Sequence, residues 1–382
     1  MSNKITLKQL IPVFLSFYVM GFVDLVGVAT GYIKQDFNLS DSIAQLLPSM
    51  VFIWFALVSI PTGIFQDKHG KKSTVTISML VTGVGLLIPF FHYSLSTVVI
   101  AFIILGIGNT MLQVSANPLL IDLSSKETKA ANLSLSQFIK AIASMMGPML
   151  VAIIARSTGD WKLIFPLYAV VSALSAFWLY SVKIEESKPE KEPASLKSVL
   201  KLFKIKYIVV MLLSVFFMVG FDVAINTNIA NFLSKRFSIN LETASMGISI
   251  YFAALMVGRF TGAFLLRKLN INKFLTTSTI LTLAGLAGLI ASNNLQLTWA
   301  MIFLTGLGFA NIFPIIFTIA VDKRPEYSNE ISGMIILAVC GGAVIPPIMG
   351  VISDSFGVTQ SLYVLVACIL YVTYSAYYAS KN

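Results

Sequence analysis

The chain has 382 residues, of which 57% are hydrophobic and only 12% are charged. That charged share is about half of what soluble domains carry, and a soluble core cannot bury so much apolar surface. A transmembrane helix uses about 20 apolar residues, so about twelve spans with their connections fill this length. The composition therefore predicts a protein embedded in the lipid bilayer and leaves no room for a soluble catalytic domain.

Apolar runs that are long enough to cross a bilayer follow one another along the chain. The first run follows Lys4 and Lys8 and has no small-residue cleavage site, so we interpret it as an uncleaved span. Most connections are short, and consecutive spans should therefore be antiparallel neighbours. The predicted spans are 9–33, 43–66, 73–93, 96–121, 130–155, 161–182, 207–234, 243–266, 272–292, 297–321, 328–353 and 358–380.

Residues 183–206 form a long, highly charged connection that contains Pro189 and Pro193. We interpret it as a cytoplasmic linker between two six-helix halves, residues 1–182 and 207–382, and expect an amphipathic surface helix over 195–203. The halves repeat: Gly106-Ile-Gly108 recurs as Gly306-Leu-Gly308 after 200 residues. Several such matches at a near-constant offset indicate a duplicated six-helix unit, with a site at the midplane between the two copies.

The distribution of Lys and Arg explains the formal net charge of +10 without nucleic acid. We place 20 of the 27 basic residues on one side of the membrane, five on the other and two inside spans. This matches the positive-inside rule for a bacterial-type inner (plasma) membrane, with both termini cytoplasmic. No aromatic–basic surface module is visible, which argues against nucleic-acid binding. The five on the other side are Lys34, Arg156, Lys162, Lys235 and Arg236.

No pattern typical of an enzyme or a metal site is present. Cys340 and Cys368 lie in apolar runs, where inert buried thiols are the simplest interpretation. The two histidines have no Cys or carboxylate neighbours at metal-ligand spacing, and no phosphate loop or nucleophile elbow is found. We therefore expect no cofactor, no metal and no enzymatic activity.

The loop after the second span reads Gly63-Ile-Phe-Gln-Asp67-Lys68-His-Gly70-Lys71-Lys72. It resembles the signature cytoplasmic motif of the major facilitator superfamily. The resemblance implies that Gly63 and Gly70 allow close approach and turning, while Asp67 caps a helix end or pairs with a base such as Lys71. A solvated basic turn is the alternative. The corresponding loop of the second half has Leu266 in place of the Asp, so the motif is no longer complete there.

Further segments in spans 4, 5, 7, 8, 10 and 11 are similar to the fucose–galactose–glucose:proton symporter family. The most specific are Asn117-Pro118 in span 4 and the run from Gly341 to Pro346 in span 11. The resemblance extends from span 1 to span 12. It implies an all-α membrane protein with the major facilitator fold, twelve helices in two pseudo-symmetric halves. It also implies a monomer that takes up a small sugar with an ion, usually a proton, by alternating access.

Three positions depart from that family. Its acid in span 1 stands about one helical turn later, where this chain has Val28, and the acid here is Asp24. Span 4 has Gln113 where the fucose permease has a carboxylate. The Asn that usually follows the span-5 glutamine Gln137 is here Lys140. These changes bear on the identity of the sugar and on the coupling.

Four charged side chains fall inside the spans: Asp24, Lys140, Asp222 and Arg259. Each costs at least about 2.5–3.5 kcal/mol at the centre of a lipid-facing helix, so each must face the protein, a water-filled cavity or another charge. One interpretation is two ion pairs that fix helix packing, which suits Arg259 best. The other assigns proton coupling to Asp24, Asp222 and Lys140, because desolvation favours the protonated form of a carboxylate.

Lys140 supports two hypotheses. It neutralises Asp24 and controls its protonation, or it binds the carboxylate of an acidic sugar such as a sialic or uronic acid. A sodium-coupled sugar symporter and a proton-coupled drug or metabolite exporter of the same fold are the alternative functions.

Sugar recognition needs polar side chains that bind two hydroxyls, together with an aromatic face. Asn117 has a structural alternative, because it could satisfy the carbonyl that Pro118 leaves free. Most aromatic side chains in such a protein face lipid or other helices. Pro314 and Pro346 permit the kinks on which rocking depends. The candidates for substrate binding are Gln113, Asn117, Gln137, Lys140, Asn226, Asn311, Phe22, Trp54 and Tyr251.

Overall fold

The computed structural model describes residues 7–124, 129–184, 186, 202–265, 269–324 and 328–381. All regular elements in these ranges are helices, and twelve stretches are long and apolar enough to cross a membrane. Each of the twelve predicted spans corresponds to one of them, so the predicted all-α, multi-pass membrane protein is confirmed.

The elements up to residue 181 are α1 (Leu7–Met20), η1 (Gly21–Asp24), α2 (Leu25–Asp36), α3 (Asp41–Ala44), α4 (Leu46–His69), α5 (Lys71–Phe91), α6 (Leu95–Asp122), α7 (Lys129–Thr158), η2 (Trp161–Leu163) and α8 (Ile164–Ser181). The later elements are α10 (Lys206–Phe237), α11 (Leu241–Leu265), α12 (Ile271–Ala291), α13 (Leu295–Phe309), α14 (Ile312–Asp322), α15 (Ser328–Ala338), α16 (Gly341–Phe356) and α17 (Val358–Lys381).

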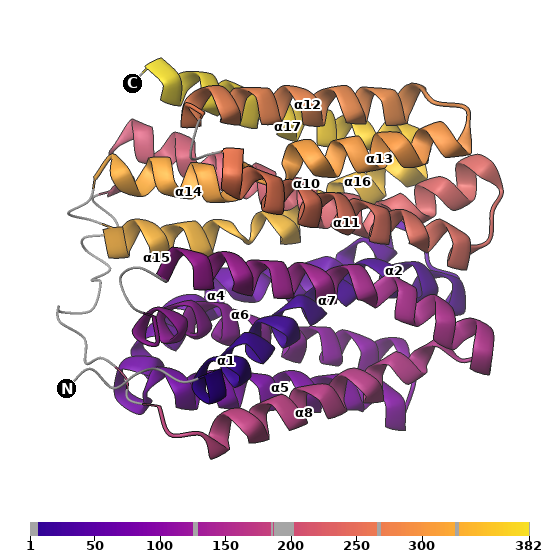
Figure 1. Cartoon of the computed structure of the whole chain (residues 1–382). Coiled ribbons are helices and arrows are strands. Elements are labelled where there is room, and N and C mark those ends of the chain that lie inside the picture. Colours follow the sequence, from indigo (N-terminus) through magenta and orange to yellow (C-terminus); the bar gives the residue numbers. More distant parts are fainter. Residues whose placement is uncertain are drawn as a thin grey trace.

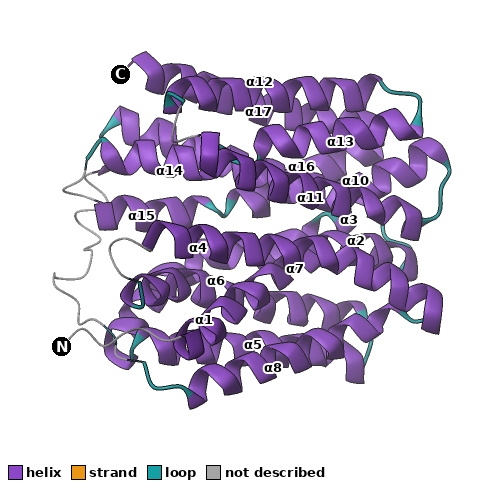
Figure 2. Ribbon diagram, viewed as in Figure 1, coloured by secondary structure: helices purple, strands orange, loops and turns teal. Residues whose placement is uncertain are grey.

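The helices lie roughly parallel in one bundle, with α1 to α8 on one side and α10 to α17 on the other (Figure 1). The start of α1 and the end of α17 lie at the same end of the bundle, which we call the terminal face. The opposite end, with the turn between α2 and α3, is called the far face; Figure 2 shows its short loops in teal. The expected surface helix over 195–203 falls largely outside the described residues.

Several spans are interrupted where the helical hydrogen-bond ladder is broken. Span 10 breaks between α13 and α14, at Ala310 and Asn311. Ala310 is four residues before Pro314, which has no N–H to donate to the Ala310 carbonyl, so the break lies where Pro314 removes a helical hydrogen bond. Pro347 likewise leaves the Ala343 carbonyl free, and the Ser49 hydroxyl of α4 donates to it. A proline in one half is thus compensated by a side chain of the other.

The turn between α4 and α5 contains the signature loop. Gly70 ends α4 with a φ of +86°, a conformation that favours glycine, and α5 begins at the next residue. The Glu186 carboxylate accepts the backbone N–H groups of Lys71 and Lys72, the latter at 2.9 Å. Lys71 also forms an ion pair of 2.6 Å with Asp122 of α6. The sequence did not predict Glu186, which caps α5 from a distant segment.

Replacing Glu186 with Gln should destabilise this end of the bundle. An uncharged amide interacts less well with a helix N-terminus and can accept fewer of the free N–H groups there. We expect a loss of about 1 kcal/mol, seen as a lower apparent unfolding temperature in detergent. Asp67→Asn is the control, because the Asp67 carboxylate lies on the same face, is exposed and makes no hydrogen bond or ion pair with the residues that the structure describes. Equal effects of the two changes would contradict a capping role.

Candidate functional site

The central site is organised around the break in the first span. A short 3₁₀ turn, Gly21–Asp24, separates α1 from α2, and Asp24 is its last residue. The side-chain amide of Asn109 on α6 donates to the Met20 carbonyl at 2.9 Å, just before the turn. The amide of Asn226 on α10 donates to the Asp24 carbonyl at 3.2 Å. Two side chains therefore bind backbone carbonyls on either side of the break.

A row of amides on α6 supports this turn. The Gln113 side-chain amide donates to the side-chain oxygen (Oδ1) of Asn109 at 2.9 Å, and Asn109 is fully buried. Asn117 donates to the Gln113 backbone carbonyl at 3.3 Å. That carbonyl is one residue before Val114, the one that Pro118 deprives of its helical donor. Sequence analysis missed Asn109, although its spacing of four residues from Gln113 places both on one helix face.

The Asp24 carboxylate accepts one hydrogen bond, from the Ser144 hydroxyl of α7 at 2.5 Å. The turn lies close to α7, since a Cβ atom at Gly21 would come within 2.7 Å of the Lys140 carbonyl. Among the described residues, Asp24 makes no ion pair within 4 Å. Among the described residues, the Ser144 hydroxyl is therefore the one direct hydrogen-bond donor to this carboxylate.

The four charged residues in the spans form one electrostatic group. Lys140 and Arg259 both attract Asp24 and Asp222, and the two carboxylates repel each other. Asp222 accepts a hydrogen bond from the Tyr251 hydroxyl at 2.7 Å. All four charged side chains are only partly buried. Within the described part of the chain none of them is in a salt bridge, so the alternative of two packing ion pairs is not what this conformation contains.

Two predicted substrate residues carry buried polar atoms without a partner in the described part of the chain. There, the Asn226 side-chain oxygen and the Trp54 indole N–H accept or donate no hydrogen bond. Such atoms are costly unless a ligand or water binds them. Gln137, on α7 three residues before Lys140, likewise makes no hydrogen bond to the residues that the structure describes.

Three other candidates are engaged in protein contacts in this conformation. Asn311 donates to the Gly258 carbonyl at 2.7 Å and holds α14 against α11. Phe22 is fully buried and its ring stacks on Tyr168, with centroids 3.8 Å apart. Tyr251 is also fully buried. Their roles in substrate binding stay predictions, and none offers a free surface here. Among the described residues, no His, Cys, Asp or Glu group is arranged to hold a metal ion.

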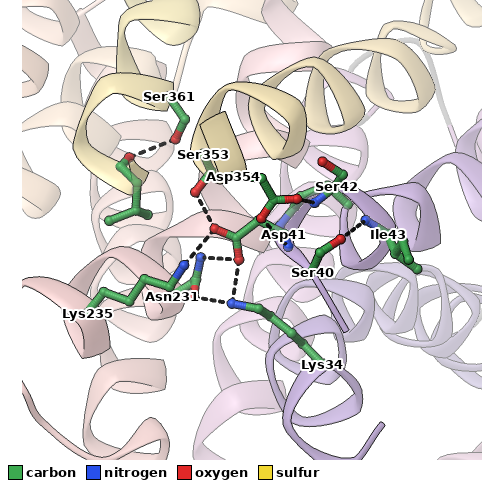
Figure 3. A network of polar contacts seen from close by, with 12 residues as sticks. Lys34, Ser40, Asp41, Ser42, Ile43, Asn231, Lys235, Ser353, Asp354 and Ser361 are labelled. Carbon is green, nitrogen blue, oxygen red and sulfur yellow. Dashed lines mark hydrogen bonds and ion pairs between the residues drawn. The ribbon is translucent and has the colours of Figure 1, made fainter. Parts of the chain in front are cut away.

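A second polar cluster lies at the far face (Figure 3). Its centre is Asp41, only 2% exposed, which forms ion pairs with Lys34 and with Lys235, the latter at 2.8 Å. Asn231 and Ser353 also donate to its carboxylate. Lys235, Asn231 and Ser353 come from the second half. Sequence analysis treated Lys34 and Lys235 only as topology signals, because their shared partner is distant in the chain.

Asn109 should hold the turn that carries Asp24. Asn109→Leu removes the side-chain donor to the Met20 carbonyl and the acceptor of the Gln113 amide, and the loss of buried hydrogen bonds of this kind costs about 1–3 kcal/mol. We expect a clear fall in the apparent unfolding temperature. Gln113→Leu removes only the second bond and should cost less. If Gln113→Leu costs as much as Asn109→Leu, the bond to Met20 is not what fixes the turn.

Comparison with known proteins places this architecture in a family. Residues 13–347 match the model of the Major Facilitator Superfamily. A putative glucose/galactose transporter of Helicobacter pylori strain J99 is 30% identical, over 100% of this chain and 97% of that protein. The L-fucose-proton symporter of Escherichia coli K12 is 21% identical, over 85% and 82% of the two chains.

A solved structure agrees with the fold. A bacterial homologue of the human lysosomal transporter Spinster, in an inward-facing and occupied conformation, has a TM-score of 0.80 at 14% identity, covering 97% of this chain and 96% of that one. At that identity the likeness concerns the fold alone. From the family match and the full-length relatives together, the chain belongs to the Major Facilitator Superfamily of membrane transporters and is not an enzyme.

Proposed function

We propose that this protein imports a small sugar together with a proton by alternating access. The relatives named as glucose/galactose transporters and as an L-fucose-proton symporter support a sugar as the substrate. The observation that carries proton coupling is the state of Asp24. It is a mid-span carboxylate with one hydrogen bond and no ion pair among the described residues.

Protonation of Asp24 changes the balance of charge in the centre. It removes the repulsion from Asp222 and the attraction of Lys140 and Arg259. The carbonyl of Asp24 is bound by Asn226, which belongs to the other half. A movement of the turn therefore changes a hydrogen bond between the two halves. Proton coupling requires such a link between the protonation of Asp24 and the relative motion of the halves.

The orientation of the carrier in the membrane follows from the charge asymmetry. The terminal face carries most of the Lys and Arg, and we assign it to the cytoplasm. The far face then faces the outside, with the Asp41 cluster at the outer ends of α2 and α10. Uptake requires this cluster to open when the carrier loads its sugar.

The coupling role is tested with Asp24→Asn. The amide cannot carry a proton across the membrane, so gradient-driven accumulation should fall to an inside-to-outside ratio of about 1. Exchange of labelled for unlabelled sugar should survive, since it needs no net proton movement. Both are measured in proteoliposomes. Asp160→Asn is the control, because Asp160 is 43% exposed and pairs with Lys162 at the far face.

Full accumulation by Asp24→Asn would show that the coupling acid lies elsewhere. Uptake at fixed pH with and without sodium separates proton from sodium coupling in the unmodified protein. A requirement for sodium would overturn the proposed ion.

A second candidate substrate is an acidic sugar, and Lys140 favours it. This ammonium group has no ion pair or hydrogen bond within the described residues, so a substrate carboxylate can bind it. Lys140→Asn should then weaken binding of a sialic or uronic acid about ten-fold or more and spare neutral hexoses. Ligand-induced thermal shifts measure both. Unchanged ligand choice would leave Lys140 as a partner of Asp24 only.

A further inference from the structure

The pattern of the signature loop occurs a second time in the chain. Gly63, Asp67 and Gly70 have the spacing Gly-x-x-x-Asp-x-x-Gly, and the same spacing is found over residues 350–357, Gly-Val-Ile-Ser-Asp-Ser-Phe-Gly. Both copies end a helix, α4 and α16, and both close with a glycine of positive φ, +86° at Gly70 and +105° at Gly357. The first copy lies at the terminal face and the second at the far face.

The far-face copy is engaged with the other half. The Asp354 carboxylate accepts the backbone N–H groups of Asp41 and Ser42 at 2.8 Å and 2.7 Å (Figure 3). Its first glycine, Gly350, allows this approach: a Cβ atom there would lie 2.6 Å from the Asp41 carbonyl and 3.0 Å from the Gln45 Cβ. The end of α16 is therefore seated on the start of the second span.

The terminal-face copy is free in the same structure. A Cβ atom at Gly63 would meet no atom within 4 Å. The Asp67 side chain is exposed and makes no hydrogen bond or ion pair with the residues that the structure describes. Two identical patterns on opposite faces are thus in opposite states, one docked and one open.

The other contacts between the halves agree with this asymmetry. Between described residues, the hydrogen bonds that join the halves run from the centre, at Asn226 and Asp24, to the far face. Those nearest the far face include Gln45 with Thr227 and Arg156 with Glu242. The far face is therefore closed in this conformation.

We propose that Gly350 and Asp354 form a latch that closes the far face and must release whenever the carrier opens to that side. Carboxylate bonds to backbone N–H groups are charge-assisted and directional, so they hold one docked position. The ion pair between Asp41 and Lys235 lies beside the docked residues and joins the two halves at the same interface. The proposal rests on alternating access and on no particular sugar or ion.

Pulsed electron paramagnetic resonance tests the latch without any substrate. Nitroxide labels go on cysteines at Ser96 and Gln296, which are exposed at the far-face ends of α6 and α13. The native Cys340 and Cys368 are replaced by Ser and Ala. In lipid nanodiscs the parent should show the short far-face distance. Asp354→Asn loses a charge and one acceptor, and should raise the ratio of long to short distances about ten-fold.

Gly350→Ala should act in the same direction, because its Cβ displaces α16 from the Asp41 backbone. Gly63→Ala is the matched control in the first copy, at the terminal face, and should not open the far face. A single symmetric peak in size-exclusion chromatography shows that a variant is folded. If Gly350→Ala does not fold, the Asp354→Asn result alone tests the latch. Unchanged distances in Asp354→Asn, or equal opening by Gly63→Ala, would overturn the latch. Since neither sugar nor a proton gradient is present, the result is independent of the proposed transport activity.

Discussion

A backbone carbonyl inside a bilayer needs a hydrogen-bond donor from the protein, and the architecture of this carrier depends on how its broken helices meet that need. Where the first span breaks, Asn109 and Asn226 bind the carbonyls of Met20 and Asp24. Where Pro347 removes a donor, Ser49 supplies one. At both of these places the side chain that binds the carbonyl belongs to a different helix.

A related rule holds for the charged side chains inside the bundle, because each must be hydrated, form an ion pair or bind a proton or ligand. At the far face Asp41 is paired with two lysines and buried. In the centre, Asp24, Lys140, Asp222 and Arg259 interact at a distance and remain partly open. The first arrangement is suited to closing an interface, and the second to binding a proton or a ligand.

The spans could be predicted from sequence because apolar length is a local property of the chain. The partners of individual side chains could not be predicted, because they come from distant segments. Glu186 and Asp354 cap helices that lie far away in the chain. Asn311 was predicted from its place in span 10 as a substrate-binding residue, and that role stays a prediction; in this conformation it lies at the break between α13 and α14 and its amide donates to the Gly258 carbonyl. The number of residues along a broken helix does not determine the direction in which a later side chain points around the helix axis.

The bond from Ser49 to the Ala343 carbonyl has a consequence for the water in the carrier. It crosses from one half to the other, so separation of the halves removes the donor from a carbonyl that its own helix cannot satisfy. Only water can then replace the hydroxyl in the empty carrier. Entry of water into the cleft and separation of the halves therefore become one event, and drying the cleft is part of closing it.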